Sequence, residues 1–68
     1  MERIYETVRK NILKYRHKKG LSQEELALRA SLHRAYIGQV ERGEKRIGLG
    51  NLQKIADALE NDIRDFFD

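Results

Sequence analysis

The sequence predicts a compact all-α fold of five helices, and three observations indicate this class. Apolar residues recur every three or four positions along most of the 68-residue chain, which is the spacing of one helix face. Proline is absent, and no stretch alternates apolar and polar residues as a strand does. Ser22 is followed three residues later by Glu25, a capping-box pattern that marks the start of a helix. We expect a single domain that covers residues 1–68.

Composition excludes several classes of protein and of site. The chain has no Cys, so disulfides and Cys-based zinc sites are excluded, and its two His residues lack partners at metal-ligand spacing. We therefore expect no metal and no cofactor. No apolar run approaches the roughly 18 residues that a membrane span needs, and no secretory signal pattern is present. We expect a cytoplasmic protein with no membrane partner.

Charge is distributed unevenly along the chain. Residues 1–46 contain 12 Lys and Arg against 6 Asp and Glu, a net of +6, whereas residues 47–68 contain 2 against 5, a net of −3. A basic front and an acidic tail favour a polyanion such as nucleic acid as the partner of one surface. Ordinary solvent-facing helix charge explains the same counts, so charge alone leaves the two interpretations about even.

The first two predicted helices lie on either side of Gly20. Residues 2–18 carry an apolar stripe at helical spacing, which comprises Ile4, Val8, Ile12 and Tyr15. Gly20 suits the left-handed cap that ends such a helix. A second helix is expected over residues 23–30, directly after the capping box.

The third predicted helix, over about residues 33–42, follows a turn of the length that a helix-turn-helix needs. Ile37 and Val40 lie about one turn apart and are expected to face the core. At about 100° per residue, the side chains that then point outwards are Ala35, Gln39 and Arg42.

The C-terminal third predicts two more helices. Residues 50–59 carry an apolar stripe that includes Leu49, Leu52, Ile55, Ala56 and Leu59. Asp62 is expected to cap a final short helix over about residues 62–68, with Ile63, Phe66 and Phe67 on it. Two adjacent aromatic residues do not easily both turn inwards, so we expect this segment to contact a second copy of the chain. The alternative is that both rings close the core.

The central stretch and its flanks resemble the lambda-repressor-like (Cro/cI, or XRE) helix-turn-helix family. The resemblance covers about residues 8–67 and depends on short matches in the family's order and spacing: Leu21-Ser22-Gln23-Glu24-Glu25-Leu26-Ala27, Tyr36-Ile37, Glu41-Arg42-Gly43 and Ile55-Ala56-Asp57-Ala58-Leu59. It implies a lambda-repressor-like fold whose helix-turn-helix occupies about residues 22–43.

Three positions depart from the family pattern. Ser31 and Glu60 stand where the family usually has Gly, and His33 stands where it usually has a Ser or Thr cap. A left-handed backbone at Ser31 costs about 1 kcal/mol. Either Ser31 caps the third helix instead, or that helix begins with a weaker cap. After the fourth helix, we expect Asn61 to take the left-handed conformation.

By the resemblance, Arg34, Ala35 and Gln39 are the positions that read DNA bases. Arg34 can form a bidentate pair with guanine, Gln39 can do the same with adenine, and the methyl group of Ala35 can touch a thymine methyl. The alternative is that all three are merely exposed helix residues.

The remaining roles concern phosphate contact and support of the third helix. We expect DNA phosphates to be contacted by Ser22, Gln23, His33, Tyr36, Arg42, Lys45 and Arg46. For Tyr36, packing on the core is an equally good interpretation. The resemblance also implies that Arg16 braces the third helix by pairing with Glu41, the alternative being a surface Arg that contributes less than about 1 kcal/mol.

These features predict a sequence-specific transcription regulator that binds a palindromic operator of double-stranded DNA as a homodimer, with half-sites about 34 Å apart. The run from His33 to Ile37, with Glu41-Arg42-Gly43, resembles the controller proteins of restriction–modification systems, and small phage-type repressors are also similar. At this length we expect no small-molecule effector. An antitoxin-type module, which binds a protein partner first and DNA second, is the alternative. An enzyme fits poorly, because no nucleophile–base pattern or phosphate-cradling loop is present.

Overall fold

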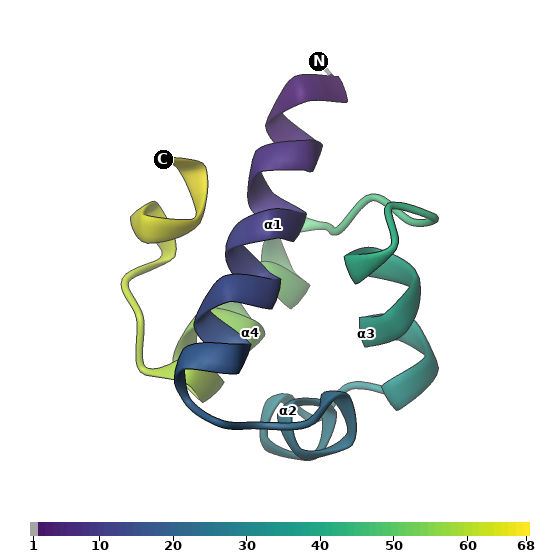
Figure 1. Cartoon of the computed structure of the whole chain (residues 1–68), viewed down its shortest axis with the longest axis vertical. Coiled ribbons are helices and arrows are strands. Elements are labelled where there is room, and N and C mark those ends of the chain that lie inside the picture. The colour runs from purple at the N-terminus through teal and green to yellow at the C-terminus, as the bar shows by residue number, and fades with distance from the viewer. Residues whose placement is uncertain (1) are drawn as a thin grey trace.

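The computed structural model describes residues 2–68, so Met1 of the predicted domain lies outside the described residues. Four α-helices and one 3-10 helix follow in order: α1 (Glu2–Lys18), α2 (Gln23–Ala30), α3 (Arg34–Glu41), α4 (Leu49–Leu59) and η1 (Ile63–Phe67) (Figure 1). No strand occurs in this part of the chain. The all-α prediction is therefore confirmed. The predicted count of five α-helices is wrong, because the last helical element is a 3-10 helix.

Helix α1 runs through the middle of the molecule, with α3 on one side and η1 on the other (Figure 1). Helix α2 packs against both α3 and α4, and α4 closes the core behind α1. The side chains that are almost fully enclosed come from every element: Ile12, Leu26, Ile37, Val40, Leu52, Ile55, Leu59 and Phe66. One continuous apolar core thus fixes α2 and α3 relative to α1.

The ends of α2 and α3 follow local hydrogen bonding. The hydroxyl of Ser22 accepts from the backbone N–H of Glu25 at 3.0 Å, and the Glu25 carboxylate accepts from the Ser22 N–H at 2.8 Å, which confirms the capping box. Ser31 adopts the left-handed conformation (φ 57°) in which it ends α2, so it does not cap α3. His33 precedes α3 without a side-chain hydrogen bond, which is the weaker of the two caps expected.

Short-range hydrogen bonds at its start and a hydrogen bond to α1 at its end hold the last segment, which is a 3-10 helix. Asp62 caps it, and the N–H of Asp65 donates to the Asp62 carbonyl, a 3-10 turn. The Phe66 carbonyl accepts from Nδ2 of Asn11 on α1 at 2.9 Å. Phe66 points into the core at 0% exposure, and its ring meets that of Tyr15 edge-on, 5.3 Å between centroids.

Three predicted positions are wrong. Ile4 and Leu49 lie on apolar stripes that predict a position in the core, but they are 40% and 71% exposed, and each lies in the first turn of its helix. Glu60, not Asn61, takes the left-handed conformation after α4 (φ 59°). Asn61 instead bonds through its side chain to Asp65. No helix in residues 2–68 is long and apolar enough to cross a bilayer.

Candidate nucleic-acid interface

Helix α3 presents one face to the core and the other to solvent. Ile37 and Val40 are enclosed, whereas Arg34 and Ala35 are exposed and Gln39 is half-buried. The three positions expected to read bases are therefore accessible on one convex surface. An α-helix of this exposure can enter a DNA major groove.

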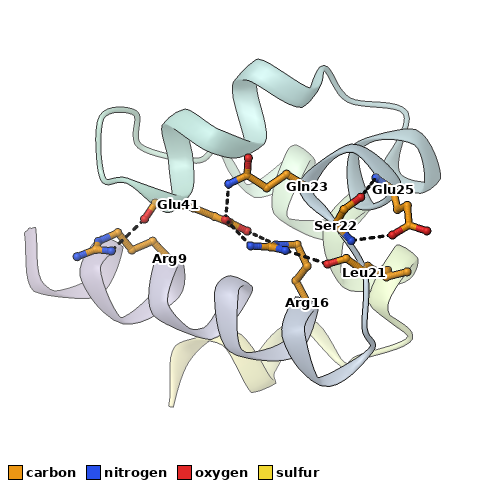
Figure 2. Close-up of polar contacts among 7 residues, drawn as sticks. All are labelled: Arg9, Arg16, Leu21, Ser22, Gln23, Glu25 and Glu41. Carbon is orange, nitrogen blue, oxygen red and sulfur yellow. Dashed lines mark hydrogen bonds and ion pairs between the residues drawn. The ribbon is translucent and has the colours of Figure 1, made fainter.

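A buried ion pair holds α3 against α1, as Figure 2 shows. The guanidinium of Arg16 grips Glu41 with two hydrogen bonds, Nε to Oε2 at 2.7 Å and Nη2 to Oε1 at 3.0 Å. The third arm, Nη1, donates to the Leu21 carbonyl at 2.8 Å and so also holds the start of the helix-turn-helix. The Arg16 and Glu41 side chains are only 9% and 3% exposed. The geometry favours the brace over the alternative of a surface Arg.

Two more side chains converge on Glu41. Nε2 of Gln23, at the first position of α2, donates to Glu41 Oε1 at 2.8 Å (Figure 2). Nη1 of Arg9, two turns before Arg16 on α1, donates to the Glu41 carbonyl at 3.0 Å. Arg9 also pairs with Glu6, whose carboxyl pKa is lowered chiefly by that hydrogen bond. The end of α3 is thus tied to α1 and to α2.

The end of α3 and the loop after it carry three of the expected phosphate contacts, Arg42, Lys45 and Arg46. Gly43 is left-handed (φ 78°) and ends the helix. Arg42 pairs with Glu44 two residues on, at 2.8 Å from Nε to Oε2, and the pairing lowers the pKa of Glu44. Lys45 lies 6.0 Å from the centroid of the Tyr36 ring. Arg42 and Lys45 are both exposed at the end of α3.

The residues expected to contact phosphates differ in the contacts that they already make within the protein. Ser22 is occupied by the capping box, and His33 is exposed in front of α3. The Tyr36 ring packs against the core, and its hydroxyl accepts from Nδ2 of Asn51 at 3.1 Å, so both interpretations of this residue stay open. The guanidinium of Arg46 lies 5.2 Å from the centroid of the Tyr5 ring.

The three residues expected to contact a second copy differ in their exposure. Phe66 is fully enclosed in the core, so its assignment to a contact with a second copy is wrong. Ile63 is half-buried against the core, and Phe67 is 40% exposed. Phe67 instead lines a pocket of about 190 Å³ together with Ile4 and Leu49, the two apolar residues that the helix ends expose.

Sequence reasoning missed several residues that shape this region. Arg9 lies seven residues before Arg16, which is two helical turns, and that spacing was a usable signal for a second tie to α3. Asn11 is a polar residue beside the apolar stripe of α1, a position that indicates a buried hydrogen bond. Asn51 and Glu44 gave no local signal, because their partners depend on how the loop folds.

Comparisons with known proteins agree with this geometry. Residues 12–66 match the family model HTH_3, described as helix-turn-helix. The chain is 43% identical to control protein C.SmaI of Serratia marcescens over 60 residues, 88% of this chain and 71% of that protein. It is 43% identical to control protein C.BamHI of Bacillus amyloliquefaciens over 51 residues, 75% of this chain but 63% of the relative's length. The crystal structure of the restriction–modification controller protein C.AhdI from Aeromonas hydrophila superposes with a TM-score of 0.86 at 41% identity, covering 90% of this chain and 92% of that one.

Proposed function

The chain belongs to the helix-turn-helix family, and from this premise we propose that it is a DNA-binding transcription regulator that reads a specific operator sequence. One observation carries the proposal: Arg34, Ala35 and Gln39 are accessible on α3, while the buried ion pair of Glu41 with Arg16 fixes the last turn of this helix to α1. A braced helix loses little conformational freedom on binding, so its contacts contribute to affinity and to discrimination between bases.

Base reading is assigned to the exposed face of α3. Arg34 donates to O6 and N7 of a guanine, Gln39 makes a paired contact with an adenine, and Ala35 meets a thymine methyl. Each good paired contact discriminates against a wrong base by about 1–3 kcal/mol.

Phosphate contact is assigned to the rim of that face. Lys45 and Arg46 follow α3 and are exposed, and Gln23 opens α2 where backbone N–H groups also face an anion. Such contacts set register and affinity on every sequence, and their number determines the salt dependence of binding.

The regulator would act as a homodimer. A single copy measures 29 × 23 × 20 Å, so a side-by-side pair is long enough for its two recognition helices to lie roughly 34 Å apart, the separation of successive major grooves on one side of DNA. Phe67, Leu49 and Ile4 surround one shallow pocket and leave apolar surface in solvent. We infer that a two-fold axis passes near this pocket, so that both copies cover it and the operator is palindromic.

The relatives suggest which genes are controlled. C.SmaI and C.BamHI are named as control proteins, and C.AhdI is named as a restriction–modification controller. We propose the same role here, in the cytoplasm and with control by protein concentration through dimerisation.

Selection of bound fragments from random-sequence DNA tests the proposal. The expected result is a consensus with two-fold symmetry whose half-sites are centred about one helical turn apart. Arg34→Ala should lose about 1–3 kcal/mol on that consensus and relax preference at one base pair of each half-site. The matched variant Lys45→Ala should instead lose affinity on every sequence and reduce the salt slope by about one unit. Failure to enrich any sequence would contradict the proposal, and an asymmetric consensus would contradict the dimer.

A further inference from the structure

The first turns of α1 lie beside the loop that follows α3. Tyr5 and Arg9 are four residues apart, so they occupy the same face of α1. Both line a pocket of about 220 Å³ that residues 43–47 of the loop also line. The helix-turn-helix family match begins at residue 12, so this face of α1 lies before the matched part of the chain. The family match therefore assigns no role to it.

Arg9 fixes the start of this loop against α1. Its Nη1 donates to the Glu41 carbonyl at 3.0 Å (Figure 2), and its Nε donates to Oε1 of Glu6 at 2.9 Å. The Arg9 side chain also lies against the left-handed Gly43, where an added Cβ would meet Nε at 3.3 Å. The backbone that leads from α3 into the loop is thereby held at a defined place beside α1.

The two consecutive cations of the loop lie over rings of different helices. Nζ of Lys45 lies 6.0 Å from the centroid of the Tyr36 ring on α3, whereas Cζ of Arg46 lies 5.2 Å from the centroid of the Tyr5 ring on α1. Arg46 is exposed, and ordering an exposed Arg side chain on binding costs conformational entropy. An aromatic ring attracts the charge of a guanidinium without accepting its directional N–H bonds. Tyr5 therefore restrains the direction of Arg46 without itself using a hydrogen-bond donor of the guanidinium.

We propose that Tyr5 is a positioning residue, whose ring sets the direction of the Arg46 guanidinium before DNA binds, so that the guanidinium meets a backbone phosphate with less loss of side-chain freedom. The inference rests on the proposed function and extends it to the first turns of α1. Phosphates are present on every DNA sequence, so Tyr5 contributes to affinity and not to the choice of bases.

Two substitutions of Tyr5 test whether the ring is what matters. Tyr5→Leu removes the ring but keeps an apolar side chain, and it should weaken binding about two- to fivefold, on the selected consensus and on unrelated DNA alike. Tyr5→Phe keeps the ring and should bind as the wild type does. Equal losses in the two variants, wild-type affinity for Tyr5→Leu, or a loss confined to one base pair would overturn the inference.

A cycle with Arg46→Ala separates positioning from a structural role of Tyr5. Tyr5 also lines the apolar pocket around Phe67, so a loss caused by weaker dimerisation or lower stability would persist when Arg46 is Ala. Positioning predicts instead that Tyr5→Leu costs little further affinity in the Arg46→Ala background, and equal losses in both backgrounds would contradict it.

The salt dependence of binding tests the contact that Tyr5 is proposed to support. Arg46→Ala should reduce the salt slope by about one unit, and an unchanged slope would overturn the inference. Lys14→Ala is the matched control, because it removes another cation of α1 that lies over a ring, that of Tyr15 at 5.0 Å, and neither residue lines the pocket between α1 and the loop. Its salt slope should equal that of the wild type.

Proton NMR of the free protein distinguishes failure of this inference from failure of the proposed function. The ring current of Tyr5 should shift the side-chain protons of Arg46 upfield, and Tyr5→Leu should abolish that shift. Absence of the shift in the wild type would overturn the inference even if the protein binds DNA. If the shift is present but the wild type binds no DNA, the proposed function fails and the positioning role fails with it.

Discussion

Replacement of Glu41 by Ala is the sharpest test of the brace that holds α3. The substitution removes the only carboxylate that the Arg16 guanidinium grips in the described residues, and it also strips Gln23 of its partner. Because the Arg16 side chain is 9% exposed, its charge would be left in a largely dry environment. Loss of one partner from such a buried pair costs about 3–5 kcal/mol.

That loss is large for a chain of this size. Folded domains are stable by about 0.05–0.15 kcal/mol per residue, which is roughly 3–10 kcal/mol for a domain like this one. At about 4–8 °C per kcal/mol, the thermal unfolding midpoint of Glu41→Ala should fall by roughly 12–40 °C. Circular dichroism at 222 nm during heating measures the midpoint, and urea titration gives the free energy of unfolding.

Two matched variants test whether the loss of the buried ion pair causes the fall in the unfolding midpoint. Glu44→Ala removes another carboxylate paired with an Arg near α3, but that pair is exposed, so the midpoint should change little. Arg16→Met combined with Glu41→Leu removes both buried charges and should be clearly more stable than Glu41→Ala. A loss below about 1 kcal/mol in Glu41→Ala, or no recovery in the double variant, would refute the brace as a structural element.

Other substitutions test the C-terminal segment and the turn. Phe66→Ala should lose about 3–5 kcal/mol by urea titration, whereas Phe67→Ala should keep the fold and shift sedimentation towards monomer. The Arg64 side chain and N–H lower the Asp62 pKa from 3.8 to about 2, so this carboxylate stabilises the fold above pH 3.8, and the effect disappears as pH falls towards 2. Asp62→Asn should therefore flatten the pH dependence of the unfolding midpoint in that interval. Ser31→Gly should add about 1 kcal/mol of stability, and no gain would contradict a strained turn.

The exposed face of α3 was predictable from local rules. Once Ile37 and Val40 are placed inwards, the angle of about 100° between successive helical residues directs Ala35 and Gln39 outwards. The pairing of Arg16 with Glu41 came from resemblance, since the two residues are 25 positions apart and no local pattern links them. The partner of Gln23 was not predictable, because it depends on the approach of a second element.

The sequence by itself determined where α2 begins and where α1 and α3 end, because capping and periodicity act over three or four residues. Ser22 with Glu25 and the left-handed Gly20 and Gly43 are of this kind. Only the tertiary structure decided which apolar residues are enclosed. Phe66 is buried and Leu49 is exposed because burial depends on what packs against a side chain from elsewhere in the chain, and a stripe of apolar residues does not contain that information.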